Sequence, residues 1–221
     1  MTQAAIRTSD HEKVSATASK VHVGCGPHAL LEGWCNSDLR PFAGVDHVMD
    51  ATEPWPFSGL THVFGEHFIE HLDIDKAVDF LVHAGNSLAP GGRMRLSTPN
   101  VAWVVHTHFA LDPADDEQRL TDTLNLNRAF HGWGHRFLWS TEMLTGVIAA
   151  LGFEDVELFA YGESDDPQLA GLERHGGYSV VDGHPSVIIV EAVRGEQPIA
   201  RRPHIDAWID HEFLRHVRGG H

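Results

Sequence analysis

The sequence predicts an α/β fold with a mostly parallel sheet of seven strands and helices on both faces. Short apolar runs alternate with longer amphipathic stretches, as expected where helices connect parallel strands. The first run leads directly into Gly24 and Gly26, and the second ends at Asp38. Glycines at this point let a ligand approach main-chain N–H groups, and a carboxylate on the neighbouring strand can bind ribose hydroxyls. These observations predict a nucleoside cofactor site.

The strands and helices follow from local patterns. We expect strands at residues 21–24, 34–39, 47–49, 61–64, 93–97, 153–161 and 186–193. A helix at 73–88 has apolar residues at helical spacing and is followed by Pro90-Gly91-Gly92, a strong stop signal. A second helix at 140–151 begins with Ser and Thr and ends at Gly152.

The chain of 221 residues suits one domain. We expect a flexible N-terminal arm at 1–19, the domain itself at 20–196 and a C-terminal tail at 197–221. The stretch 101–139 is rich in His, Trp and Asp, and an insertion of this length predicts a lid over the substrate. The tail has two helical turns at most, and its apolar residues could pair two copies, so a homodimer is the default expectation.

Composition limits the partners. A formal charge of −15 disfavours nucleic acids, because affinity for them depends on Lys and Arg. No apolar run approaches the ~18 residues of a membrane span, and no secretory signal is evident. The two cysteines form no CxxC pair and are expected to be reduced packing residues. These features indicate a cytoplasmic protein that acts on a small molecule.

Five motifs occur in a recognisable order: VHVGCG, GWCNSDLRP, MDATEPWPF, FGEHFIEHL and LAPGGRMRLSTPN. Together they resemble the class I S-adenosylmethionine-dependent methyltransferases, and the best match is the small stand-alone branch with GCG, NxD, EHxxEHL and PGG motifs. The resemblance covers roughly residues 20–195. It implies a Rossmann-like fold, S-adenosylmethionine (SAM) as the cofactor and S-adenosylhomocysteine (SAH) as its product.

The resemblance also implies the cofactor contacts. The two glycines would face the methionine part, Asp38 would bind the ribose, and Asp50 with the backbone of Ala51 would meet the adenine. In the alternative, Asp50 only caps the turn at Thr52. The full set of implied cofactor residues is Val23, Gly24, Gly26, Asp38, Asp50, Ala51, Glu66 and His67.

The sequence departs from the family pattern at two positions. His22 stands where an acidic residue is frequent, and His28 stands where a third glycine is common. The distance from Gly24 to Asp38 is also shorter than the ~20 residues of a dinucleotide fold. The first helix must therefore be very short, which disfavours an NAD-type enzyme.

His67 is the leading candidate for a general base. Methyl transfer to a hydroxyl requires removal of its proton, and an imidazole beside a carboxylate suits this near neutral pH. We expect Glu66 or Glu70 to orient it, with His135 as another catalytic candidate. In the alternative, His67 only lines the cofactor pocket. The HxxEH spacing also matches a zinc-protease helix, but here it begins where a strand ends.

The insertion supplies candidates for binding the acceptor. They are His106, His108, Trp133, His135 and Arg136. Trp133 could stack on a sugar ring or simply close the lid. A divalent metal is conceivable, since some sugar methyltransferases use magnesium, but no ligand set has convincing spacing and we predict no metal ligands.

We therefore expect a SAM-dependent O-methyltransferase whose acceptor is small and polar, with a sugar hydroxyl of an oligosaccharide or glycosylated metabolite preferred. In size and lid composition the chain loosely resembles enzymes that methylate mannosides or glucosides for intracellular polymethylated polysaccharides. Two alternatives stay open. One is methylation of a phenol, carboxylate or amine, and the other is a non-catalytic SAM-binding module.

Overall fold

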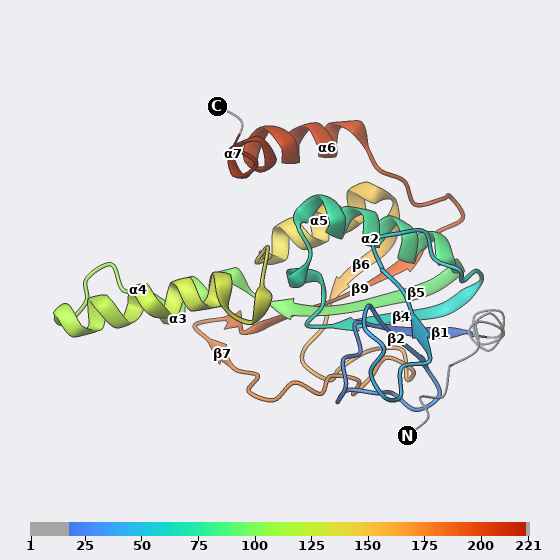
Figure 1. The fold of residues 1–221 in the computed structure, drawn as a ribbon, viewed down its shortest axis with the longest axis horizontal. Coiled ribbons are helices and arrows are strands. Elements are labelled where there is room, and N and C mark those ends of the chain that lie inside the picture. Colours follow the sequence, from blue (N-terminus) through green and yellow to red (C-terminus); the bar gives the residue numbers. More distant parts are fainter. Residues whose placement is uncertain (1–17, 220–221) are drawn as a thin grey trace, which may run out of the picture.

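The computed structural model describes residues 18–219, so most of the expected N-terminal arm lies outside the described residues. A seven-stranded sheet runs through the molecule in the order β3-β2-β1-β4-β5-β9-β6 (Figure 1). Its strands are β1 (Lys20–Val23), β2 (Cys35–Asp38), β3 (His47–Val48), β4 (Leu60–Glu66), β5 (Leu88–Pro99), β6 (Phe153–Leu158) and β9 (Val187–Arg194). Pairings among β1 to β5 are parallel, whereas β9 is antiparallel to both of its neighbours. The predicted mostly parallel sheet is confirmed.

Helices α2 (Ile74–Ser87) and α5 (Thr141–Leu151) cover one face of the sheet (Figure 1). The apolar residues of α2 that face the sheet are buried in the main core. The hydroxyl of Ser140 accepts a hydrogen bond from the Met143 N–H and caps α5, and Gly152 ends that helix with φ of 108°. Both predicted helices are therefore confirmed, and α5 has its predicted start and stop signals. Helix α2 ends at Ser87, and the predicted stop signal Pro90-Gly91-Gly92 lies within β5, which begins earlier than expected.

The other face differs from the prediction, because segments without helix cover it (Figure 1). Phe64 of β4 packs there with Trp34 and Leu169 in a separate apolar cluster. The covering segments are residues 24–34 and 159–179. The first is too short and too rich in turns for the short helix that was expected. The expectation of helices on both faces was thus wrong for this side.

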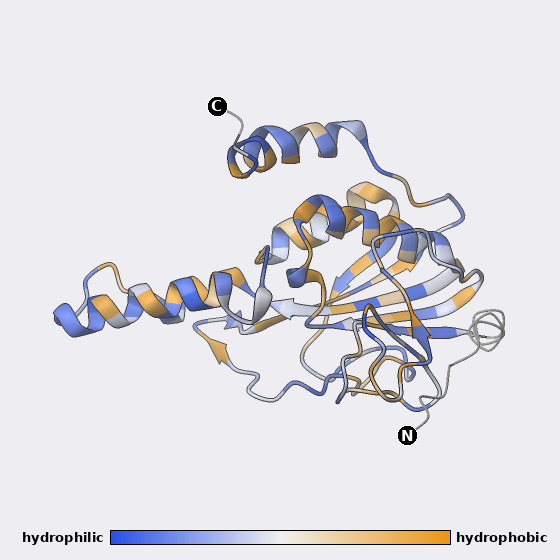
Figure 2. Cartoon of the chain, in the orientation of Figure 1, coloured by the Kyte–Doolittle hydropathy of each residue, from blue (hydrophilic) through white to orange (hydrophobic). Residues whose placement is uncertain are grey.

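The predicted lid is a helical hairpin that projects from the end of β5 (Figure 1). It consists of α3 (Val101–His108), α4 (Asp116–His131) and the single turn η2 (Gly132–Gly134). The side chains of Asn100 and Asp115 cap α3 and α4 through hydrogen bonds from backbone N–H groups. Figure 2 shows apolar residues among hydrophilic ones along the hairpin, and Leu120 and Leu124 of α4 are exposed. The hairpin therefore buries little of α4 within the chain.

Two short strands, β7 (Val180–Val181) and β8 (His184–Pro185), form a small hairpin beside α3 that the sequence did not predict. Each has only two residues, so neither carries a usable alternation of apolar and polar residues. No helix within residues 18–219 is both long and apolar enough to span a membrane.

The C-terminal tail is more helical than the two turns that were predicted. It contains α6 (Pro203–Ile209), the π-helical η3 (Asp210–Leu214) and α7 (Arg215–Val217) in direct succession. Pro203 suits the first turn of a helix, and Ile209 and Leu214 are buried in the main core. The Asn86 side chain also hydrogen-bonds both the N–H and the C=O of Ile199. Ile209 and Leu214 therefore stabilise their own chain, whereas Trp208 and Val217 of the same tail are exposed. Pairing of two copies through the tail stays a prediction.

Candidate active site

The expected cofactor residues meet at the carboxyl edge of β1, β2 and β3. Asp38 accepts hydrogen bonds from the N–H of Gly26 at 3.0 Å and from the N–H of Arg40 at 2.9 Å, one at each carboxylate oxygen. Each oxygen keeps a further lone pair for a ligand hydroxyl. Gly24 has φ of 65°, and a Cβ atom there would lie 2.4 Å from the Phe68 ring. The sequence therefore needs glycine at this position for both conformation and packing.

Asp50 lies on the same edge, after β3, and is exposed. One of its oxygens accepts hydrogen bonds from the N–H and the hydroxyl of Thr52, at 2.9 and 2.7 Å. These bonds lower the pKa of the Asp50 carboxyl. The turn is further fixed because the Trp55 indole donates to the Ala51 carbonyl at 2.9 Å. Asp50 thus caps the turn, which was the alternative expectation, and it follows β3, in which Val48 pairs with Asp38 of β2. Val23 is buried in the main core.

His67 follows β4 and forms a pair with Glu70. Its Nδ1 lies 3.0 Å from Glu70 Oε1, and the other oxygen of Glu70 accepts a hydrogen bond from the Thr98 hydroxyl at 3.0 Å. Glu70 is fully buried. Among the described residues nothing hydrogen-bonds His67 Nε2, which is itself buried. A carboxylate on Nδ1 favours the tautomer in which Nε2 carries the lone pair, so the imidazole is arranged to accept a proton there.

Of the two carboxylates expected to orient His67, Glu70 does so, and Glu66 makes its hydrogen bonds elsewhere. It accepts hydrogen bonds from the backbone N–H groups of Arg174 and His175, at 2.9 to 3.0 Å. These bonds hold the 172–178 segment over the end of β4. The His175 ring packs against His67 in a tilted arrangement, with ring centroids 4.2 Å apart. Burial lowers the pKa of His175, and the nearby His67 lowers it further.

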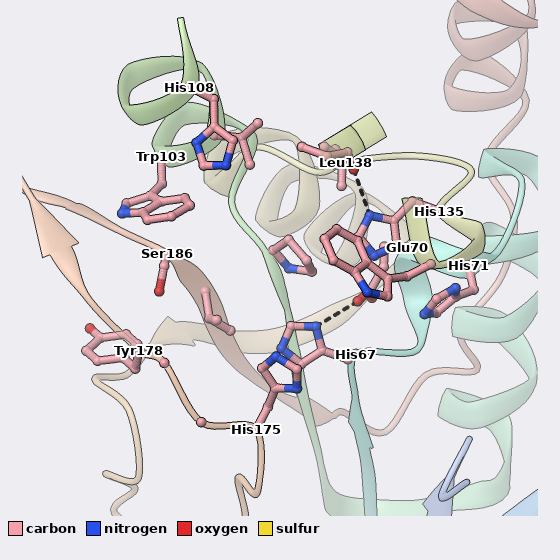
Figure 3. A pocket seen from close by; sticks show the side chains of 17 residues that line it. His67, Glu70, His71, Trp103, His108, His135, Leu138, His175, Tyr178 and Ser186 are labelled. Carbon is pink, nitrogen blue, oxygen red and sulfur yellow. Dashed lines mark hydrogen bonds and ion pairs between the residues drawn. The ribbon is translucent and has the colours of Figure 1, made fainter. Parts of the chain in front are cut away.

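A cavity of about 410 Å³ lies beside this pair, between β5, the lid and the 172–178 segment (Figure 3). Its volume falls in the range of small-molecule pockets. Apolar and aromatic side chains form most of the wall, and histidines supply polar groups. Its lining residues are His67, Glu70, His71, Pro99, Trp103, Val104, His108, Ala129, Trp133, His135, Leu138, His175, Gly176, Gly177, Tyr178, Ser186 and Val187.

Three of the five expected acceptor residues line this cavity: His108, Trp133 and His135. The other two lie outside it. His106 is 2.8 Å from Asp182 on the exposed side of α3. The Arg136 guanidinium is exposed and lies 3.6 Å from the carboxylate of Asp73. The helical period explains the difference, since His106 and His108 fall on different faces of α3.

Sequence reasoning missed several cavity residues. His71 is the last residue of the HxxEH motif, but the spacing of that motif indicated only a zinc-protease helix and gave His71 no place in an acceptor site. In the structure His67 has φ of 46° and the single 3-10 turn η1 (Ile69–His71) follows, so the motif does not form an α-helix. The other missed residues lie far along the chain without a motif of their own; they are Trp103, His175, Tyr178 and Ser186.

The two cysteines are free and buried, as expected. Burial raises the pKa of the Cys25 thiol to about 11 and that of Cys35 to about 12. Because the thiolate is the reactive form, neither residue is suited to nucleophilic chemistry. Both serve as packing residues near the glycine turn.

No protein-family model matches the chain, and no curated protein matches it. Among solved structures, a SAM-dependent methyltransferase from Archaeoglobus fulgidus is 18% identical; the match covers 82% of this chain and 88% of that one, with a TM-score of 0.51. A SAM-dependent methyltransferase from Thermotoga maritima is 13% identical, with 84% and 86% of the two chains covered and a TM-score of 0.48. Phosphoethanolamine N-methyltransferase 2 of Haemonchus contortus, solved with SAM, is 13% identical, with 85% and 52% covered and a TM-score of 0.45.

The likeness to the Archaeoglobus structure shows the fold of the chain. This likeness and the strand order β3-β2-β1-β4-β5-β9-β6 show that the chain has the class I methyltransferase fold. The resemblance found in the sequence motifs is thereby confirmed at the level of the fold.

Proposed function

We propose that the chain is a SAM-dependent O-methyltransferase. The cofactor would lie along the carboxyl ends of β1 to β4, where ligands bind in open α/β sheets. Gly24 and Gly26 would face its methionine part, Asp38 its ribose, and Asp50 with the Ala51 backbone its adenine. Support comes from the shared fold and from the free lone pairs that Asp38 keeps at this edge.

The observation that carries the proposal is the His67–Glu70 pair at the end of β4. Glu70 is buried and holds the imidazole by Nδ1, and Nε2 has no partner among the described residues. His67 lines the cavity and follows the strand that pairs with β1, which leads into the glycine turn. The His67 side chain therefore lies between the proposed cofactor groove and the proposed acceptor cavity.

In the proposed reaction, the acceptor oxygen attacks the sulfonium methyl carbon in line with the departing sulfur. The new C–O bond forms as the C–S bond breaks, which leaves neutral SAH. The hydroxyl proton moves to His67 Nε2, and the buried carboxylate of Glu70 stabilises the resulting imidazolium. The segment held by Glu66 covers the site and limits the access of water.

A sugar hydroxyl is the proposed acceptor. Trp103, Trp133 and Tyr178 give the cavity wall flat aromatic faces, and the histidines give it hydrogen-bonding groups. No Lys or Arg is among the described residues that line it, which suits an uncharged acceptor. A cytoplasmic location belongs to the same proposal, and the two free thiols support it.

Thermal unfolding with increasing SAM or SAH tests the cofactor part. A ligand that binds only the folded state stabilises it by about 2.7 kcal/mol at a hundredfold excess over its Kd, so a clear rise in Tm is expected. No rise at saturating cofactor would remove the enzyme assignment, and a rise without turnover on any acceptor would favour a binding module.

An acceptor panel assayed by SAH release tests the chemistry. Mono- and oligosaccharides, phenols, carboxylic acids and amines would be compared at equal concentration. Release with saccharides is expected, and hydrolysis of SAM without an acceptor is the background. Turnover confined to phenols, acids or amines would contradict the sugar assignment while leaving methyl transfer intact.

A further inference from the structure

We propose that Glu70, His71 and His135 form a binding site for a divalent transition-metal ion on the wall of the cavity. One potential ligand atom from each side chain lies within 4.8 Å of the other two. Ligands that share one ion at 2.0–2.2 Å lie about 3–4 Å apart. Small side-chain rotations therefore suffice to bring all three onto one ion.

Two separate segments build this cluster, and main-chain hydrogen bonds join them. Glu70 and His71 belong to η1, and His135 follows η2 at the base of the lid. The N–H groups of Arg136 and Phe137 both donate to the Glu70 carbonyl, at 2.7 and 3.2 Å. The His71 and His135 rings lie with centroids 5.2 Å apart, and Figure 3 shows both beside Glu70. The three donors are thus held together by the backbone rather than by chance side-chain positions.

Each donor has a lone pair available. The Nδ1 of His135 lies 2.8 Å from the Ala129 carbonyl and must donate its proton to it, which leaves Nε2 as the acceptor atom. Histidine ligands of metals are commonly oriented by such a bond to a backbone carbonyl. The His71 ring makes no hydrogen bond to the described residues. Glu70 uses two lone pairs for His67 and Thr98, and a carboxylate has about four.

The donor set selects the kind of metal. Two imidazoles with one carboxylate suit Zn²⁺ and related first-row ions, whereas Mg²⁺ and Ca²⁺ prefer oxygen ligands only. Three protein ligands leave a coordination position open, which is the arrangement of catalytic rather than structural sites. Because all three residues line the cavity, the open coordination position of the ion would face that cavity.

The role of the ion rests on the proposed function, whereas the site itself rests on geometry alone. An acceptor hydroxyl that binds the open position would be fixed in the cavity and would lose its proton more readily. His67 shares Glu70 with the cluster, so its Nε2 is placed to take that proton. The ion would therefore select acceptors whose reactive oxygen is a good metal ligand.

Titration of the chelator-treated chain with Co²⁺ tests the site without any methyl transfer. We expect one equivalent to bind, with visible d–d absorption, and Zn²⁺ to displace it. His71→Ala and His135→Ala should each weaken binding at least tenfold. His108→Ala is the matched control, since His108 lines the same cavity outside the cluster, and it should leave Co²⁺ binding unchanged.

The fold and the cofactor site are checked on the same samples. His71→Ala removes a partly exposed ring without hydrogen bonds, so its metal-free Tm and its SAH affinity should match those of the wild type. A wild-type chain that binds no Co²⁺, or one whose binding survives both cluster variants, would overturn the metal site. Intact SAH binding with no metal binding would remove this inference alone, and loss of SAH binding would instead contradict the proposed function.

Discussion

The backbone of His67 has φ of 46°, a left-handed conformation that is uncommon for any residue except glycine. Two contacts maintain it: the His67 N–H donates to the Ser97 carbonyl at 2.9 Å, and the ring bonds the buried Glu70. Such strain costs of order 1–3 kcal/mol and concentrates at functional sites. The turn aims the imidazole at the cavity instead of continuing β4, so the local conformation and the proposed chemistry agree.

His67→Gln should lower kcat by about 10²-fold or more, because the side chain that removes the acceptor proton is lost. SAH affinity, measured by calorimetry, should stay within about twofold of the wild type, since Gln keeps a similar volume. Equal losses in rate and in affinity would instead make His67 a wall of the cofactor pocket.

Asp38→Asn should weaken SAM binding by about 1.5–3 kcal/mol through the loss of a charged hydrogen-bond acceptor. The asparagine carbonyl can still accept from one of the two backbone N–H groups, which limits damage to the turn. Glu32→Gln is the control, because this exposed carboxylate lies on the same connection after β1. Calorimetric titration with SAM measures the affinity of both variants, and Glu32→Gln should match the wild type. Equal affinities for D38N and the wild type would exclude Asp38 as the ribose ligand.

His22 gives the stability of the fold a pH dependence. Burial lowers its pKa to about 4, although a hydrogen bond with Asn36 partly opposes this. Below about pH 6.5 the unfolded chain binds a proton on this ring, whereas the folded chain does so only near pH 4. The free energy of unfolding should therefore fall as the pH drops through this window, by on the order of 2–3 kcal/mol.

Urea unfolding at about pH 7 and about pH 4.5 measures this loss. His22→Gln should lose clearly less stability between the two conditions than the wild type, because no proton binds at this position. His28→Gln removes an exposed imidazole and should behave like the wild type. A wild-type pH dependence in H22Q would mean that other groups cause it.

At the level of elements, Arg95 of β5 joins the sheet to the non-helical segment that covers its second face. Its guanidinium is fully buried and bonds Glu173 at 2.7 Å and Glu191 of β9 at 2.6 Å. Burying these charges is costly unless they remain paired. The network therefore specifies where the 159–179 segment lies, although a buried ion pair is weak support for overall stability.

Arg95→Met should destabilise the fold by about 3–5 kcal/mol, because the buried carboxylate of Glu173 loses its ion-pair partner and that of Glu191 keeps only the longer pair with Arg93, at 3.7 Å. Arg93→Met is the matched control on the same strand, since its side chain is partly exposed and its ion pairs are longer, at 3.7 and 3.8 Å. Denaturant unfolding of the two variants gives the comparison. A loss below about 1 kcal/mol for R95M would show that the network contributes little.

Strands β1, β4 and β9 were predictable because each contains an apolar run, and the start and stop signals of α5 were equally clear. The segment that covers the second face of the sheet could not be predicted, because the apolar residues of 159–179 follow neither a helical nor a strand period. The full tail helix was also missed, since Ile209 and Leu214 gain their stability from the core and not from local propensity.

At the level of the whole molecule, the fold assembles one site from distant parts of the chain. The motif residues Gly24, Asp38 and His67 were predictable because Asp38 ends a strand of the sheet and the other two directly follow one. The cluster of Glu70, His71 and His135 could not be predicted, because His135 reaches η1 only through the tertiary contact at the base of the lid. The same explanation holds for His175, which reaches His67 because Glu66 binds its backbone. Local patterns thus predicted the proposed cofactor edge, and tertiary contacts created the proposed acceptor side.

The central claim is that the glycine edge of the sheet binds SAM with its methyl group directed towards His67. A crystal structure of the chain with SAH tests this most directly. We predict the ribose hydroxyls on the carboxylate of Asp38, the adenine beside Asp50 and Ala51, and the sulfur facing His67. An empty edge at saturating SAH, or SAH bound in any other part of the molecule, would contradict the claim.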